Sequence, residues 1–290
     1  MSEHDCPIGR KAAIVKVLAS QCEQGICRIC GGASRKEFTA QVLRKYSVKY
    51  FLCATCGAVT TEDPYWLDEA YTDAVATADT GLVSRNVALS KCITSLLVCL
   101  FNRDARFLDI SGGTGLFTRL MRDNGFDYYW FDPYCKNVHA RGFEKCSQVD
   151  DFRVVTAFEV LEHLQDPITF ISQALQSERT VALVFTTELF EAPPPRIKDW
   201  DYYVPETGQH ICFYQRATLQ YIANSLDVHF YSSCGIHMFS KQAVSGFIFA
   251  LSVGRAGRLA APLFKKFLLR SKTLSDHKLV IGSGVVRNSP

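Results

Sequence analysis

Hydrophobic positions in the middle of the chain follow the period of a strand and the period of a helix in turn. Short apolar runs bounded by turn residues predict strands at residues 106–110, 127–132, 153–158 and 180–187. Apolar residues at helical spacing predict helices at residues 115–124 and 166–177. Gly125 after the first helix and Pro167 in the first turn of the second fit these boundaries. Strands and helices that alternate in this way predict an α/β fold with a Rossmann-like, doubly wound sheet.

The segments around this alternation have other patterns. Residues 1–60 begin with a helical pattern over 9–21 and continue with paired cysteines and the alternating stretch YSVKYFLC, which predicts a small domain of short strands. Apolar residues within 61–104 have helical spacing, so we expect this segment to connect the small domain to the Rossmann-like domain. A helix and a hairpin close the Rossmann-like domain, which is expected to span residues 105–254. Residues 255–290 form a basic tail.

Composition narrows the class of protein. The 290 residues carry a net charge of +3, which is too small to indicate a polyanionic partner, so nucleic acid is an unlikely ligand. The longest apolar runs fall short of the roughly 20 residues of a membrane span, although the basic tail leaves weak contact with a membrane surface open. The 12 cysteines come without the pattern of a secretion signal. We therefore expect reduced thiols or metal ligands in a cytoplasmic protein.

Four of the cysteines have the spacing of a metal site. CRIC and CATC place two Cys-x-x-Cys pairs 22 residues apart, and a glycine follows each pair. This arrangement predicts tetrahedral zinc, bound by Cys27, Cys30, Cys53 and Cys56. Four protein ligands leave no open coordination position on the zinc, so we expect its role to be to stabilise the fold of the small domain.

The stretch FLDISGGTGLF predicts a ligand site. Gly113 and Gly115 let the backbone turn and approach a ligand, and the helix that follows presents free amides at its N-terminus. Asp132 ends the next strand, where a carboxylate accepts hydrogen bonds from ribose hydroxyls. Both NAD and S-adenosylmethionine fit such a loop. Asp109, just ahead of it, repels a pyrophosphate and suits the ammonium group of a methionine moiety, so it favours S-adenosylmethionine.

These motifs, together with VVTAFEVLEHLQDP, resemble those of the class I S-adenosylmethionine-dependent methyltransferases over about residues 105–240. The usual pattern has glycine where this chain has Ser111. The four-cysteine knuckle resembles a bacterial subset that includes deoxysugar C-methyltransferases, which act on nucleotide-linked sugars. The stretch DWDYYVPETGQHICFY resembles relatives that accompany cell-surface glycan synthesis, and both resemblances imply a sugar-like acceptor. The residues expected to contact the cofactor are Asp109, Ser111, Gly112, Gly113, Gly115, Asp132, Phe158 and Glu159.

Several residues are candidates for the chemistry and the acceptor. A sugar hydroxyl must lose its proton to attack the methyl group, and His210 is the preferred base, with His163 as the alternative and Glu159 as an orienting group. Glu162 is open to a functional or a structural interpretation. Residues 188–214 form an aromatic loop, expected to act as a lid whose substrate contacts are Trp200, Tyr202 and Tyr203. The alternatives are a non-catalytic binding module built on the zinc knuckle, and an NAD-dependent oxidoreductase.

Overall fold

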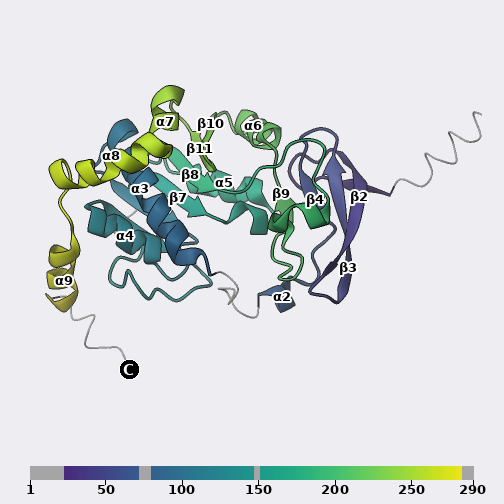
Figure 1. Ribbon diagram of the computed structural model, residues 1–290, viewed down its shortest axis with the longest axis horizontal. Helices are drawn as coiled ribbons and strands as arrows, with labels where there is room; N and C mark the ends of the chain where they lie inside the picture. The colour runs from purple at the N-terminus through teal and green to yellow at the C-terminus, as the bar shows by residue number, and fades with distance from the viewer. Residues whose placement is uncertain (1–22, 72–79, 147–150, 283–290) are drawn as a thin grey trace, which may run out of the picture.

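The computed structural model describes residues 23–71, 80–146 and 151–282, and its main feature is a twisted sheet between two helical layers (Figure 1). The strand order is β10-β11-β8-β7-β5-β6. The strands are β5 Arg106–Ile110, β6 Asp127–Phe131, β7 Phe152–Phe158, β8 Ala182–Thr186, β10 His229–Ser233 and β11 Ile236–Ser240. β5 to β8 pair in parallel, while β11 runs antiparallel to both neighbours. The predicted Rossmann-like sheet and its closing hairpin are therefore confirmed.

Helices cover both faces of this sheet. They are α3 Leu82–Leu100, α4 Leu116–Asn124, α5 Pro167–Leu175, α6 Arg216–Ser225, α7 Gly246–Val253 and α8 Arg255–Phe267. Alternate residues of β5 show the two layers, because side chains on a strand point to opposite faces. Phe107 packs in the core formed with α3, α4 and α7, whereas Leu108 packs in the core that includes α5, α6 and the small domain.

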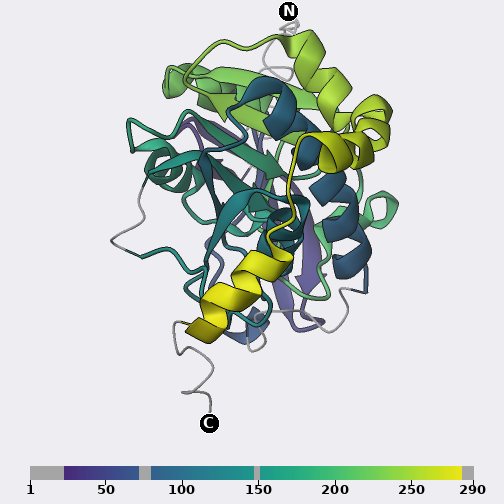
Figure 2. The same cartoon turned by 90° about the vertical axis from the view of Figure 1, so that its left-hand side faces the viewer.

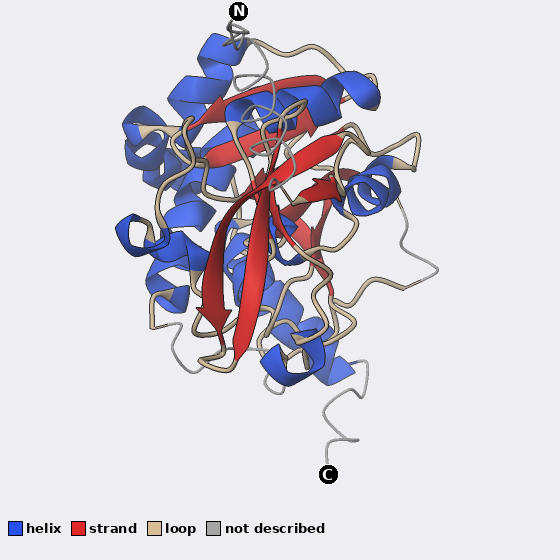
Figure 3. Ribbon diagram, turned by 90° about the vertical axis from the view of Figure 1, so that its right-hand side faces the viewer, coloured by secondary structure: helices blue, strands red, loops and turns tan. Residues whose placement is uncertain are grey.

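The small domain is a second sheet with the order β1-β2-β3-β4-β9 (Figure 3). Its antiparallel strands are β1 Gln24–Ile26, β2 Ala33–Val42, β3 Tyr46–Cys53, β4 Val59–Thr61 and β9 Cys212–Phe213. Only β9 comes from outside the N-terminal region, and it lies at the end of the segment expected to be a lid. The helix expected at residues 9–21 lies outside the described residues.

The segment of residues 188–214, called the aromatic segment below, is packed rather than free. It contains the short helices η2 Ile197–Asp199 and η3 Asp201–Tyr203 before β9. Thr60 pairs with Cys212, and Thr61 N donates a hydrogen bond to Ile211 O at 3.0 Å. The segment thus joins the two sheets, which corrects the expectation of a loop that folds over the cofactor.

The C-terminal region is docked as well. Helix α9, Thr273–Gly282, lies beside α4 (Figure 2). Its Asp276 accepts hydrogen bonds from Arg122 Nε at 2.7 Å and Arg119 Nη2 at 2.9 Å. The outer side of α8 exposes Leu259 and Phe267, so contact with a membrane surface stays a prediction.

The predicted connector contains α2, Leu67–Ala70, as well as the long helix α3. Among the described residues, α3 is apolar and long enough to cross a membrane by composition alone, and α7 with α8 pass that test only as a pair bent by 77°. Ile93, Leu96 and Leu97 of α3 are fully buried against the main sheet. This is the packing of a core helix.

Candidate active site and metal centre

The glycine loop, residues 111–115, connects β5 to α4 with left-handed backbone. Ser111, Gly113 and Gly115 have φ of 57°, 54° and 83°. The two glycines serve different purposes. A side chain at Gly115 would meet Asn137 Oδ1 at 2.7 Å, whereas one at Gly113 would meet nothing within 4 Å. Gly113 therefore presents bare backbone to open space, as a ligand-binding loop requires.

Asp132 lies against this loop directly after β6. Its Oδ2 accepts a hydrogen bond from Gly113 N at 2.9 Å, and its Oδ1 accepts from Tyr134 N at 2.8 Å and Cys135 N at 2.9 Å. Each carboxylate oxygen offers two lone pairs, so Oδ2 retains one for a ligand hydroxyl. The geometry fits the predicted ribose-binding carboxylate. Gly112 anchors the other side of the loop by donating to Phe131 O at 3.2 Å.

Asp109 lies beneath the loop rather than in its opening. Its side chain is 2% exposed and accepts hydrogen bonds from Thr156 Oγ1 at 2.9 Å and Thr118 Oγ1 at 3.4 Å. Burial raises the pKa of Asp109 to about 7, and the nearby charge of Asp132 acts in the same direction. The structure shows these threonine contacts where the sequence led us to expect an ammonium partner.

Phe158 and Glu159 follow at the carboxyl end of β7, next to β5 in the sheet. Phe158 stacks edge-on against Phe117, with ring centroids 4.7 Å apart. Glu159 has a left-handed φ of 53° and accepts a hydrogen bond from Thr186 Oγ1 at 2.6 Å. Burial and then the charge of Glu162 raise the pKa of Glu159. A carboxylate is thus held at the switch point of the sheet, where doubly wound folds bind their ligands.

The acid–histidine cluster, consisting of Glu162, His163 and His210, lies beyond this point. A carboxylate oxygen of Glu162 and one nitrogen of each histidine all lie within 4.8 Å of one another. The two imidazole rings meet edge to face, with centroids 4.7 Å apart. The structure therefore brings both predicted histidines into one site, which their distance in the sequence did not show.

Backbone carbonyls hold the two histidine rings. His210 Nδ1 lies 2.6 Å from Tyr202 O, and His163 Nδ1 lies 3.2 Å from Gln209 O and 2.9 Å from the Tyr71 hydroxyl. A carbonyl accepts only from a protonated nitrogen, so these contacts favour a proton on Nδ1 and a lone pair on Nε2. Burial lowers the pKa of His163 to about 3 and keeps that ring neutral.

The aromatic residues expected to contact the substrate have different positions. Trp200 donates from Nε1 to Glu188 at 2.7 Å, and the Tyr202 ring lies 4.6 Å from the ring of His210. Tyr203 is fully buried and packs its ring against β3 and β9. Tyr202 borders the acid–histidine cluster, and the Trp200 ring packs against Tyr202 with centroids 5.3 Å apart. Tyr203 belongs to the core between the sheets.

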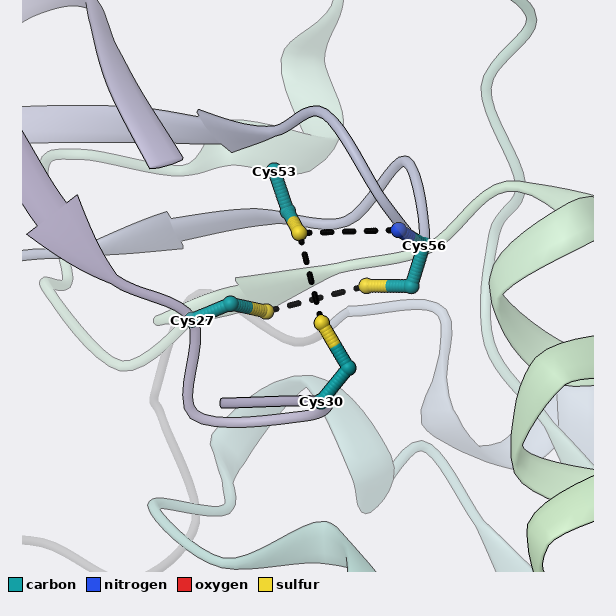
Figure 4. Close-up of side chains that lie close together, drawn as sticks. All are labelled: Cys27, Cys30, Cys53 and Cys56. Carbon is teal, nitrogen blue, oxygen red and sulfur yellow. Dashed lines mark hydrogen bonds between the residues drawn. The ribbon is translucent and has the colours of Figure 1, made fainter. Parts of the chain in front are cut away.

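The four predicted zinc ligands converge on one point (Figure 4). The Cys27 and Cys56 sulfurs are 3.6 Å apart, and those of Cys30 and Cys53 are 3.4 Å apart. Tetrahedral zinc with Zn–S bonds of about 2.3 Å requires sulfurs separated by about 3.8 Å. Backbone amides also point at the sulfurs, including Ile29 N to Cys27 Sγ at 3.4 Å. The donor set and its spacing fit zinc.

Sequence reasoning missed three contributors to the site. Thr156 donates to the carboxylate of Asp109, Thr186 donates to that of Glu159, and Tyr71 contacts His163 from the connector. Threonines inside a strand and a single tyrosine after a short helix have no distinctive spacing, so only the fold reveals them.

Comparisons with known proteins bear on the identity of this domain. A family model described as a methyltransferase domain matches residues 85–227. The chain contains a methyltransferase domain. Its mostly parallel sheet and glycine loop are those of the class I type, which uses S-adenosylmethionine. The match favours this assignment over an NAD-dependent oxidoreductase.

Solved structures similar to the methyltransferase domain include CalO1, a methyltransferase in calicheamicin biosynthesis with S-adenosylhomocysteine bound. It has 13% identity and a TM-score of 0.40, with 61% of this chain and 59% of that chain covered. A family 2 O-methyltransferase from Planctomyces limnophilus in complex with apigenin has 14% identity and a TM-score of 0.40, with 61% and 65% covered. The chain thus spans less than two thirds of the length of both proteins. No curated protein matches the chain in sequence.

Proposed function

We propose that the protein transfers a methyl group from S-adenosylmethionine to a hydroxyl oxygen of a small acceptor, a sugar or sugar conjugate. The observation that carries this proposal is the position of the acid–histidine cluster after β7, the strand that pairs with β5 and its glycine loop. A cofactor bound over the loop would therefore lie next to the side chains that follow β7, which are suited to bind an acceptor hydroxyl. The Tyr202 ring beside His210, with the Trp200 ring packed against it, offers an aromatic surface that suits the apolar face of a sugar ring.

The residues divide the reaction between them. Gly113 and Asp132 hold the cofactor, and the neighbouring Glu159 orients the acceptor. His210 takes the proton of the acceptor hydroxyl, and the oxygen lone pair attacks the methyl carbon. The electrons of the carbon–sulfur bond return to sulfur, which leaves S-adenosylhomocysteine. Because the methyl group is already electrophilic, the protein mainly has to align the acceptor oxygen with the methyl carbon and exclude water.

The four cysteines have a separate, structural role in this proposal. Zinc bound by Cys27, Cys30, Cys53 and Cys56 holds the turn between β1 and β2 against the turn between β3 and β4. Thr218 Oγ1 of α6 donates to Cys56 O at 2.8 Å, so the same turn is tied to the methyltransferase domain.

Calorimetry with S-adenosylhomocysteine tests the cofactor site. Gly113→Val and Asp132→Ala should each raise its Kd by about tenfold or more, since one fills the approach to the loop and the other removes a charged acceptor. Gly235→Val is the matched control, because Gly235 also has positive φ and open space around it. NADH should not bind to the wild type. Binding of NADH in place of S-adenosylhomocysteine would contradict the proposal.

Incubation with labelled S-adenosylmethionine and a panel of nucleotide sugars and free glycans tests the acceptor. Label should appear on an acceptor oxygen and depend on His210. A chain that binds S-adenosylhomocysteine but labels no hydroxylated acceptor would favour the non-catalytic binding module.

A further inference from the structure

The carboxylate of Glu162 is buried without a visible partner. Glu162 is 0% exposed, and neither of its side-chain oxygens has a hydrogen-bond partner in the described part of the chain. The hydroxyl of Tyr71 lies 2.9 Å from His163 Nδ1, and the hydroxyl of Tyr202 lies 3.2 Å from Thr187 Oγ1. Burying an ion without compensation is costly, so this carboxylate requires a cationic or hydrogen-bonding ligand.

The neighbours of Glu162 identify the kind of ligand. His163 and His210 each offer a nitrogen within 4.8 Å of its carboxylate oxygen. Metal bonds of about 2.0 to 2.2 Å put ligand atoms roughly 3 to 4 Å apart, which small side-chain movements reach from this arrangement. Two imidazoles and one carboxylate are a donor set that divalent transition metals prefer.

The supporting contacts are those of metal-binding histidines. The carbonyls of Tyr202 and Gln209 face the Nδ1 atoms of His210 and His163, at 2.6 and 3.2 Å. Such bonds fix the ring orientation and direct the Nε2 lone pairs away from the backbone. The histidines are partly exposed while Glu162 is buried, so the open side of the cluster faces outward. Three protein ligands leave coordination positions free for a substrate.

We propose that the acid–histidine cluster binds one divalent transition-metal cation, which coordinates the acceptor hydroxyl during methyl transfer. This proposal rests on the proposed function. The cation draws electron density from the coordinated oxygen, and the hydroxyl proton passes to water. The resulting alkoxide attacks the methyl carbon, and the carbon–sulfur electrons return to sulfur. His210 then acts as a ligand of the cation instead of taking the proton itself.

Titration of the purified, zinc-containing protein with Mn²⁺ tests the site, with free Mn²⁺ followed by electron paramagnetic resonance. The wild type should bind about one Mn²⁺ per chain, in addition to the zinc that the four cysteines already hold. Glu162→Gln and His210→Asn should each weaken binding by about tenfold or more. Glu206→Gln, an exposed carboxylate variant in the aromatic segment, should bind as the wild type does.

Stability and turnover complete the test. Without added metal, Glu162→Gln should melt at a higher temperature than the wild type, because the buried charge is gone, and Mn²⁺ should raise only the wild-type value. Absence of Mn²⁺ binding, or equal binding by wild type, Glu162→Gln and His210→Asn, would overturn the metal site. Full turnover after dialysis against a chelator that leaves the zinc in place would overturn the metal's role while leaving the methyltransferase intact. Mn²⁺ binding without any methyl transfer would support the site and contradict the proposed function.

Discussion

Asp109 should make the stability of the protein fall as the pH rises from about 4 to about 8. Its side chain is 2% exposed, and burial raises its pKa to about 7 from an ordinary value of 3.8. The folded protein therefore keeps a proton that the unfolded chain has lost. Each tenfold change in a proton equilibrium corresponds to about 1.4 kcal/mol, so the effect amounts to about 4 kcal/mol. This stability is complete below pH 4 and lost once the pH passes 7.

Asp109→Asn isolates this effect because asparagine does not titrate. Urea unfolding of wild type and variant at pH values between 4 and 8 should show their free energies of unfolding diverging by about 4 kcal/mol in favour of the variant. Any packing cost of the amide is the same at each pH and cancels. Thr156→Val removes a hydrogen bond that lowers the pKa of Asp109, so it should extend the loss to higher pH. Parallel curves for wild type and Asp109→Asn would refute the reasoning.

Two further predictions concern the C-terminal helix and the cysteines. Asp276→Ala should lower the free energy of unfolding by about 3 kcal/mol, because Arg122, whose side chain is 3% exposed, loses a bidentate partner. Urea unfolding measures this, with exposed Lys278→Ala as control, and equal stability of Asp276→Ala and wild type would contradict it. Cys30→Ala should lose zinc and methyl transfer but keep its affinity for S-adenosylhomocysteine, as metal analysis and calorimetry would show, whereas exposed Cys99→Ala should keep all three. A zinc-free Cys30→Ala protein with full turnover would exclude a supporting role for the metal.

The sequence predicts those parts of the fold that are determined by residues close together in the chain. β5 and β7 are apolar runs buried on both faces, and α4 ends at Gly125, whose φ of 111° suits glycine. The glycine loop and Asp132 were predicted from spacing alone, and the structure brings them within hydrogen-bonding distance. Such features are readable because each is set by residues close together in the chain.

The parts that were not predicted depend on contacts between distant segments. β9 has two residues, too few for any period to appear, and its pairing with β4 is decided by packing of the aromatic segment. The docking of α9 rests on an ion pair between Arg122 and Asp276, and no local sequence pattern predicts a contact between residues so far apart in the chain. Among the described residues Glu162 lacks a hydrogen-bond partner, and this is likewise a property of its surroundings, since the same residue on an exposed turn would be solvated.

A run of backbone hydrogen bonds connects the small domain to the acid–histidine cluster. Thr61 N of β4 donates to Ile211 O at 3.0 Å, and Ile211 N donates to Glu162 O at 2.8 Å. Ile211 therefore holds the edge of the small sheet on one side and the turn that carries Glu162 on the other, with His210 as its neighbour. Two histidines from distant parts of the chain need such a connection to keep a fixed spacing. Because this connection passes through the pairing of β4 with β9, we expect that loss of order at the four cysteines would change the spacing of the acid–histidine cluster.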